Sequence, residues 1–311
     1  MIVSASRRTD IPAFHSEWFL RRLKAGYAVV CNPYNNGSIH RVVLTPDVVD
    51  CIAFRTKNPA PMTQELGRMS DYNYFFQYTI NPYGAEIETN VPSLNERVKT
   101  FIDLSKRIGR ERMVWRYDPV FISPDYDLDF HFRSFEKLAS QLAPYTHRCM
   151  MGFIILHPFV AKRTNPFSIE PRNSEDIYRI AGEFAEVGLR YGMLIETCAE
   201  ETDLEQYGIR HGACIDRKHV ENIVGYPFGN VKEKYLRKYC NCMESIDIGC
   251  YSTCLNGCIY CYATINKPKI NASPENISID PGITATSISQ LQRSVTDLAC
   301  RSFKADQLSL F

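Results

Sequence analysis

The sequence lacks any long apolar run. No stretch of its 311 residues approaches the roughly 18 apolar residues that a membrane-spanning helix needs. The first residues, Met1 to Arg8, contain no apolar run long enough for a secretory signal. We therefore expect no membrane contact and a cytoplasmic location. Disulfides are rare in that reducing compartment, so the twelve cysteines are expected to be free or bound to metal.

The sequence also has no excess of one charge. Its 36 Lys and Arg and 35 Asp and Glu residues leave a net charge of +1, which excludes a broadly basic nucleic-acid coat but not a local basic groove. There is no glycine-rich phosphate loop, no G-x-S-x-G elbow, no H-E-x-x-H signature and no internal repeat. The function must therefore be sought in other features of the chain.

Short apolar runs separated by amphipathic segments dominate the first two thirds of the chain. Alternation of strands and helices predicts right-handed βαβ units and a mainly parallel sheet. About eight runs suit an α/β fold of the (β/α)8 TIM-like barrel type, regular or irregular, with a doubly wound open sheet as the alternative. The expected strands are Ile2–Ala5, Ala28–Cys31, Cys51–Phe54, Tyr74–Tyr78, Met113–Trp115, Met150–Leu156, Met193–Ile195 and Ala213–Ile215.

Two helices carry clear local signals. Ser93 and Glu96 predict a capping box that opens a helix ending near Gly109. A second helix has its apolar stripe between Ile177 and Val187, with Ser174 as the expected cap. We expect the α/β barrel to occupy residues 1–239, followed by a cysteine-rich iron–sulfur segment at 240–265 and a C-terminal extension and tail at 266–311.

Charged residues follow several of the expected strands. In a parallel barrel the carboxyl ends of the strands gather on one face, where ligands bind. Asn, Thr and Pro at these ends are equally typical of strand stops and helix caps, but the charged residues predict a polar, anion-accepting pocket. The pocket candidates are Arg7, Arg55, Lys57, Arg116 and Asp118.

The strongest chemical signal is the segment Cys254-Leu-Asn-Gly-Cys258-Ile-Tyr-Cys261, with the spacing C-x3-C-x2-C. Three thiolates on one tight loop can ligate three irons of a [4Fe–4S] cluster and leave the fourth iron open. Gly257 permits the turn that brings the cysteines together. An open iron can chelate S-adenosylmethionine, whose reductive cleavage yields a 5′-deoxyadenosyl radical.

This motif resembles that of the radical S-adenosylmethionine superfamily, and Tyr260 stands where the superfamily has its adenine-contacting aromatic residue. The closing Tyr-Cys-Tyr-Ala is similar to the spore photoproduct lyase branch. Radical enzymes usually carry these cysteines after the first strand, whereas here they follow the last. In a closed barrel those two strands are neighbours, so the resemblance implies a permuted cluster over the same mouth.

Nearly the whole chain also resembles the domain of unknown function 1848 family. The resemblance rests on Ser-Arg-Arg-Thr-Asp from Ser6, Phe-Arg-Thr-Lys-Asn-Pro from Phe54 and Trp-Arg-Tyr-Asp-Pro from Trp115, together with the cysteine tail. It implies an α/β barrel with C-terminal cysteines like those of radical enzymes, and it supplies no activity.

Four further cysteines predict a second site. Cys198 and Cys214 end expected strands, while Cys240 and Cys242 come just before the motif. Four thiolates suit either an auxiliary cluster or a structural zinc ion. The alternative is that Cys198 and Cys214 are small buried core residues.

The last residues, Gln307-Leu308-Ser309-Leu310-Phe311, resemble the pentapeptide that binds the bacterial DNA sliding clamp. Leu310 and Phe311 would enter an apolar pocket, with Gln307 and Leu308 beside them. Clamp binding would bring the chain close to DNA, where basic and aromatic residues between Arg217 and Tyr239 could contact phosphates and bases. A solvated basic face is the alternative reading.

These features predict a radical S-adenosylmethionine-like enzyme that acts in DNA repair or nucleic-acid modification, with an unidentified electron donor. One alternative is a non-catalytic iron–sulfur protein for electron transfer or sensing. Another is a barrel hydrolase or isomerase with structural zinc, whose acid–base residues would come from Asp10, Asp118, His157 and Glu196.

Overall fold

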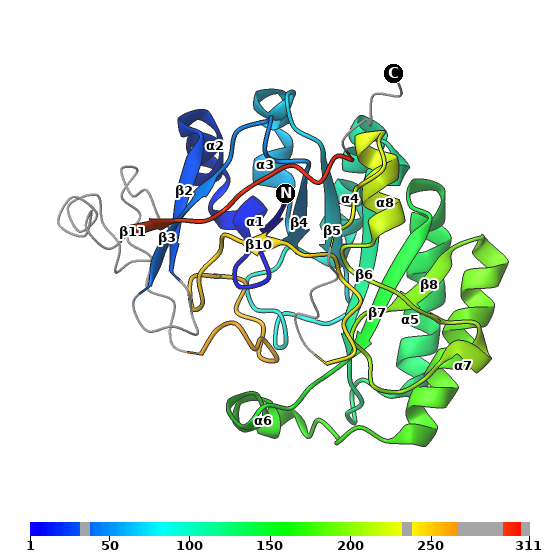
Figure 1. The fold of residues 1–311 in the computed structure, drawn as a ribbon. Helices are drawn as coiled ribbons and strands as arrows, with labels where there is room; N and C mark the ends of the chain where they lie inside the picture. Colours follow the sequence, from blue (N-terminus) through cyan, green and yellow to red (C-terminus); the bar gives the residue numbers. More distant parts are fainter. Residues whose placement is uncertain (32–37, 232–237, 266–294, 306–311) are drawn as a thin grey trace.

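The computed structural model describes residues 1–31, 38–231, 238–265 and 295–305. Its main element is an eight-stranded parallel sheet flanked by helices (Figure 1), which confirms the predicted α/β class. The strand order is β10-β1-β4-β5-β6-β7-β8-β9. These strands are β1 (Ile2–Ala5), β4 (Cys51–Thr56), β5 (Tyr74–Thr79), β6 (Met113–Val120), β7 (Arg148–Phe153), β8 (Leu194–Thr197), β9 (Arg210–His211) and β10 (Ile246–Asp247).

The sheet has two edges in the described part of the chain, β9 and β10. Strand pairing between them would close a barrel, and among the described residues no such ladder is present. A single backbone hydrogen bond, from the Met243 N–H to the Ile215 carbonyl at 3.0 Å, spans the two segments instead. Hydrogen bonding therefore leaves the sheet open between its edges.

One expected barrel strand belongs elsewhere. Residues 28–31 lie in β2 (Tyr27–Cys31), which pairs antiparallel with β3 (Ile39–Val43), and β11 (Val295–Asp297) joins β3 in parallel. The prediction of a main-sheet strand here was wrong, because a chain that returns at once pairs with its own neighbour and leaves the place beside β1 to β4. The run expected at 213–215 was also misplaced, since the strand is β9 just before it.

Eight α-helices and five short 3-10 helices are described. The α-helices are α1 (Ile11–Phe14), α2 (Ser16–Ala25), α3 (Ala60–Thr63), α4 (Leu94–Ile108), α5 (Leu128–Leu142), α6 (Pro158–Thr164), α7 (Ser174–Tyr191) and α8 (Arg217–Val224). The 3-10 helices are Leu66–Met69, Arg110–Arg112, Ala143–Tyr145, Asn165–Phe167 and Glu205–Tyr207. Ser93 and Glu96 form the predicted capping box of α4. The cap of α7 is Asn173 rather than Ser174, because its side chain accepts the Glu175 N–H at 2.9 Å.

The sheet buries apolar side chains on both faces. On one face α5 and α7 pack side by side (Figure 1), and Phe135 stacks on Phe184 with ring centroids 3.7 Å apart. Side chains alternate along a strand, so Ile52 and Phe54 of β4 join this core while Cys51 and Ala53 face the other side. That second core also holds Cys214, Cys240 and Cys242. We call the face that carries Cys51 and Ala53 the inner face of the sheet. The predicted cysteine-rich segment packs against it through Cys240 and Cys242.

The described C-terminal segment lies at the amino ends of the strands. The buried carboxylate of Asp50, just before β4, accepts hydrogen bonds from Ser302 and from the Phe303 N–H, and also from the Met1 amino group and Tyr226. The cysteine loop lies at the opposite, carboxyl ends. The two regions therefore occupy opposite ends of the sheet.

Candidate metal centres

The Cys254–Cys261 loop is fixed to the segment that follows β5. Cys258 forms an antiparallel bridge with Glu88, and the Ile259 N–H donates to the Ile87 carbonyl at 3.0 Å. Gly257 has a φ of 69°, and a Cβ there would lie 3.1 Å from Thr89. Glycine is favoured at such a position, as the sequence predicted for this turn.

A buried carboxylate beneath the loop organises its surroundings. Glu88 is 2% exposed and accepts hydrogen bonds from Lys57 Nζ at 2.8 Å, Arg97 Nη1 at 3.1 Å and Asn81 Nδ2 at 3.1 Å. Burial alone would raise the pKa of Glu88, but Lys57 and Arg97 outweigh it and hold the pKa below its usual value. Glu88 is therefore a buried residue that stays ionised.

Tyr260 is the loop residue that this carboxylate holds. Its hydroxyl donates to Glu88 and accepts from Asn81 Nδ2 at 3.2 Å. The ring is half-buried, and Lys57 Nζ lies 5.4 Å from its centroid, within cation–π range. The aromatic residue of the motif thus has a fixed position beside the cysteines.

Asp10 links the loop to two strand ends. Its carboxylate accepts from the Lys57 N–H at 2.8 Å, Asn256 Nδ2 at 2.9 Å and the Ala13 N–H at 3.1 Å. Burial raises the pKa of Asp10 despite these donors. Asp10 itself follows β1, Lys57 follows β4 and Asn256 belongs to the loop. Asp10 therefore anchors the loop to the ends of both strands.

The three loop cysteines differ in burial. Cys258 is 8% exposed, while Cys254 and Cys261 are half-buried. Burial raises the pKa of the Cys254 thiol to about 12 and that of Cys258 well above its usual value. The three sulfur atoms interact electrostatically, but they are not all within 4.8 Å of one another. This spacing differs from that of the second cysteine group.

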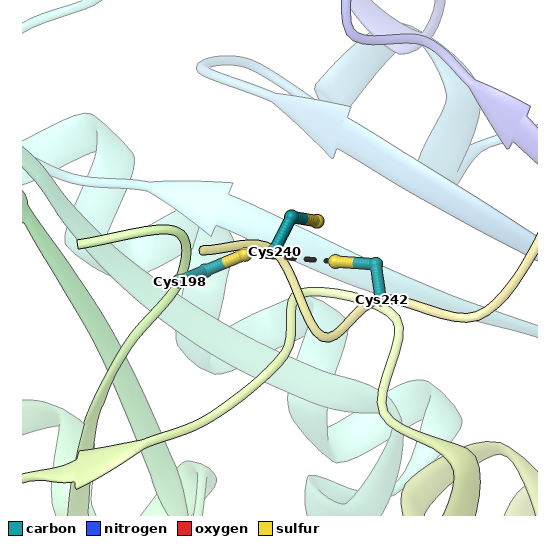
Figure 2. A group of neighbouring side chains, drawn as sticks. All are labelled: Cys198, Cys240 and Cys242. Carbon is teal, nitrogen blue, oxygen red and sulfur yellow. Dashed lines mark hydrogen bonds between the residues drawn. The ribbon is translucent and has the colours of Figure 1, made fainter. Parts of the chain in front are cut away.

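The second group consists of Cys198, Cys240 and Cys242. Their sulfur atoms all lie within 4.8 Å of one another, an arrangement that can hold a metal ion. Figure 2 shows Cys198 and Cys242 pointing toward each other, with sulfur atoms 3.5 Å apart, and Cys240 beside them. Cys240 and Cys242 are each 3% exposed. The prediction that these cysteines gather is confirmed.

Cys214 is a fourth thiol beside this group. It is a hydrogen-bonding neighbour of both Cys198 and Cys242 and is buried. Hydrogen bonds from Cys214 and Cys240 lower the pKa of the Cys198 thiol to about 7. Three of the four predicted second-site residues therefore form a compact group, and Cys214 lies next to it, with its sulfur outside the 4.8 Å spacing that the other three share.

Arginines of the neighbouring strands face this four-cysteine group. Arg116 Nη1 lies 2.9 Å from Cys214 Sγ and 3.0 Å from Gln77 Oε1, and Nη2 pairs with Asp118. Burial would lower the pKa of Arg55, but the Cys214 thiol and other neighbours raise it. Arg55 forms no ion pair with any residue of the described chain. Two guanidinium groups thus stand close to the thiols.

The predicted pocket residues divide between the two cysteine sites. Lys57 and Arg7 belong to the loop, since the Arg7 carbonyl accepts from Tyr262 at 2.8 Å. Arg7 and Arg8 also bind Asp247, with Arg8 Nε 3.0 Å from Oδ1. Burial opposes ionisation of Asp247, but Arg8 and then Arg7 lower its pKa to about 2. Arg55 and Arg116 lie near Cys214, and Asp118 connects the two sites, because its side chain pairs with Arg116 while its backbone bonds Asn81 beneath the loop.

The acid–base alternatives occupy structural positions. Glu196 is fully buried and binds Arg148 Nε at 2.7 Å and Arg210 Nε at 2.8 Å. His157, by contrast, precedes α6 and is exposed. Sequence reasoning missed Glu88 and Gln77, and no motif or spacing signals them because each acts through contacts that the fold creates. Asn81 stands in a strand-end tail, Thr79-Ile80-Asn81-Pro82, of the kind expected at the ligand-binding face.

Comparison with known proteins gives a family. The family model described as Domain of unknown function (DUF1848) matches residues 2–263. The chain belongs to the DUF1848 family. No curated protein and no solved structure matches this DUF1848 chain. The matched region contains both cysteine groups and ends just before the C-terminal extension.

Other predictions for this DUF1848 protein concern residues beyond the described ranges. Gln307, Leu308, Leu310 and Phe311 lie outside the described residues, as do the basic residues of 232–237. In the part of the chain that the structure describes, none of the helices combines the length and apolar character needed to span a membrane.

Proposed function

We propose that Cys254, Cys258 and Cys261 hold a [4Fe–4S] cluster with one open iron that binds S-adenosylmethionine, and that the protein is a radical S-adenosylmethionine-like enzyme. The observation that carries this proposal is the fixed loop: its cysteine at 258 is bridged to Glu88 at the carboxyl ends of the strands. This is the face where parallel α/β folds place their ligand sites.

The donor set fits such a cluster. Cubane clusters take thiolates on separate irons, which suits three sulfurs that do not crowd around one point. Three ligands leave one iron free for the amino and carboxylate groups of S-adenosylmethionine, whose reductive cleavage supplies a radical.

The surrounding residues have defined tasks in this proposal. Glu88 holds the Tyr260 hydroxyl, so the ring stands ready to contact the adenosine. Asp10 fixes the loop at Asn256, 2.9 Å away. Arg7, Arg55, Lys57, Arg116 and Asp118 remain the candidates for substrate contact, and their neighbours in the fold, Asp247 for Arg7 and Glu88 for Lys57 among them, would orient them. Deletion of the loop's anchors would loosen the site without removing a ligand.

A reducing location supports the cluster. None of the cysteine side chains that the structure describes forms a disulfide. Free thiols are typical of the cytoplasm, which we propose as the location. The electron donor would be a partner from the same compartment.

The experiment is anaerobic reconstitution followed by iron and sulfide analysis and electron paramagnetic resonance of the reduced protein. We expect a cubane signal that shifts when S-adenosylmethionine is added and that is lost in Cys258→Ala. Cys149→Ala is the matched control, because Cys149 is a buried cysteine away from both groups. An unchanged signal would favour an electron-transfer or sensor protein, and zinc at these cysteines without sulfide would overturn the cluster.

We further propose that the C-terminal pentapeptide binds the DNA sliding clamp and that the enzyme acts on nucleic acid. Its support is the sequence match together with the anchoring of Ser302 and Phe303 to Asp50, far from the cysteine loop. Calorimetric titration of the full chain into a purified bacterial clamp should give binding that is lost in Leu310→Ala/Phe311→Ala. Equal binding heats for the wild-type chain and this double variant would exclude clamp binding through the pentapeptide.

A further inference from the structure

The four-cysteine group stands where the sheet is open. Cys198 follows β8 and Cys214 follows β9, at one edge of the sheet. Cys240 and Cys242 lead into β10 at the other edge. The four thiols therefore join the two edges that, in the described residues, no strand pairing connects. Their position suggests a link in place of the missing ladder.

The sulfur geometry distinguishes between two kinds of metal centre. A Zn²⁺ ion with Zn–S bonds of about 2.3 Å places tetrahedral sulfur ligands about 3.8 Å apart. The observed 3.5 Å between Cys198 and Cys242 Sγ, and the 4.8 Å limit for all three sulfurs, match that edge. A cubane cluster needs wider separations, because each thiolate binds a different iron. The spacing of Cys198, Cys240 and Cys242 therefore fits one ion, and Cys214, the neighbour of Cys198 and Cys242, is the fourth ligand available to it.

The charge around the group also fits one divalent ion with four thiolates. Such a centre carries a net charge of 2−, and buried charge requires partners. Arg116 Nη1 donates to Cys214 Sγ at 2.9 Å, and Arg55 lies within electrostatic range of Cys214 and Cys242. Gln77 Nε2 holds the Cys214 carbonyl at 2.6 Å, so the ligand is also oriented through its backbone.

We propose that Cys198, Cys214, Cys240 and Cys242 bind one Zn²⁺ ion in a closed tetrathiolate site that clasps the β9 edge of the sheet to the β10 edge. Four protein ligands leave no open position, so the site is structural rather than catalytic. It holds the segment that leads to the Cys254–Cys261 loop. The clasp does not depend on the proposed enzyme activity.

The test uses a full-length variant that lacks the loop ligands, Cys254→Ala/Cys258→Ala/Cys261→Ala, loaded with Zn²⁺ under reducing conditions. We expect one zinc per chain and an X-ray absorption spectrum with four sulfur neighbours at about 2.3 Å. Adding Cys214→Ser should remove one sulfur neighbour and weaken zinc binding at least tenfold. Adding Cys149→Ser, the matched control, should change neither.

Three results would overturn the clasp. These are iron with sulfide in the loop-less variant, zinc with fewer than four sulfur neighbours, and a disulfide between Cys198 and Cys242 in the zinc-treated protein. If the variant does not fold, aerobically purified wild-type protein gives the same absorption measurement. If one of these results is obtained while wild type still gives a cubane signal, the zinc site is excluded and the proposed enzyme is not. If the zinc site is found but wild type gives no cubane signal, the zinc site is supported and the proposed enzyme is excluded.

Discussion

At the scale of single residues, the carboxylate of Glu88 is the hydrogen-bond acceptor around which the residues beneath the cysteine loop are arranged. Four donors converge on its carboxylate, two of them cationic, while the residue is 2% exposed. Removing one member of such a buried set leaves the other charges uncompensated, which costs far more than losing a surface ion pair.

The first prediction concerns Glu88→Gln. This change keeps the shape but leaves Lys57 and Arg97 without a counter-charge, so we expect a loss of about 3 kcal/mol in the free energy of unfolding. Urea titration measures it. Glu111→Gln is the control, since Glu111 is exposed and its carboxylate pairs with His147. Equal stability of the two variants would show that Glu88 does not hold the loop.

A second prediction uses pH. The pKa of Asp247 falls from 3.8 to about 2 in the folded protein. A lowered folded-state pKa contributes stability above the unfolded pKa, and that stability is lost as pH falls through the folded value. Its size here is about 2 kcal/mol.

The measurement is the difference in unfolding free energy between wild type and Asp247→Asn as a function of pH, between the unfolded and folded pKa values of Asp247. It should be largest above pH 4 and should shrink as pH approaches 2. Asp297→Asn, at an exposed carboxylate beside Arg41, should show a much smaller change. A difference independent of pH would contradict a charged Asp247 between Arg7 and Arg8.

At the scale of secondary structure elements, the sequence was informative where a signal is local. The capping box of α4 and the apolar runs of β1, β4, β5, β6, β7 and β8 are visible in the sequence because burial on both faces gives continuous apolar residues. β9 and β10 have two residues each and show no periodicity. The pairing of β2 with β3 was missed because an apolar run does not specify its partner.

The elements around the four cysteines yield a third prediction. If the clasp joins β9 to β10, removing zinc should release the segment from Cys240 to Asp247 and, through it, the cysteine loop. Hydrogen exchange of the chelator-treated protein should therefore increase in 240–261 and remain unchanged in α5 and α7, whose core is separate. Uniform exchange with and without zinc would contradict the mechanical role of the ion.

At the scale of the whole molecule, one continuous segment, residues 240–261, carries the three loop cysteines and also Cys240 and Cys242 of the second group, while Cys198 and Cys214 come from the ends of β8 and β9. The clustering of six cysteines between residues 240 and 261 predicted metal, and the four-thiol group was predicted as a possible second site. The contacts that distinguish the groups were not predictable. Arg116 reaches Cys214 only because strand register aligns β5, β6 and the segment after β9.

The pocket prediction shows the same limit. Five charged residues at strand ends were expected to line one mouth, and in the folded chain they are shared between two centres. Arg7 turns to Asp247 and Lys57 to Glu88, partners that lie 240 and 31 residues away in the sequence. Long-range ion pairs of this kind follow from topology, which residue type and spacing do not encode.

The most direct test of the central claim is electron–nuclear double resonance of the reduced cluster with S-adenosylmethionine labelled with ¹⁵N at the amino group and ¹⁷O at the carboxylate. We expect couplings from both labels, because the iron that lacks a cysteine ligand binds both groups. Absence of both couplings in protein that contains an intact cubane would contradict an open iron, and with it the assignment of a radical enzyme.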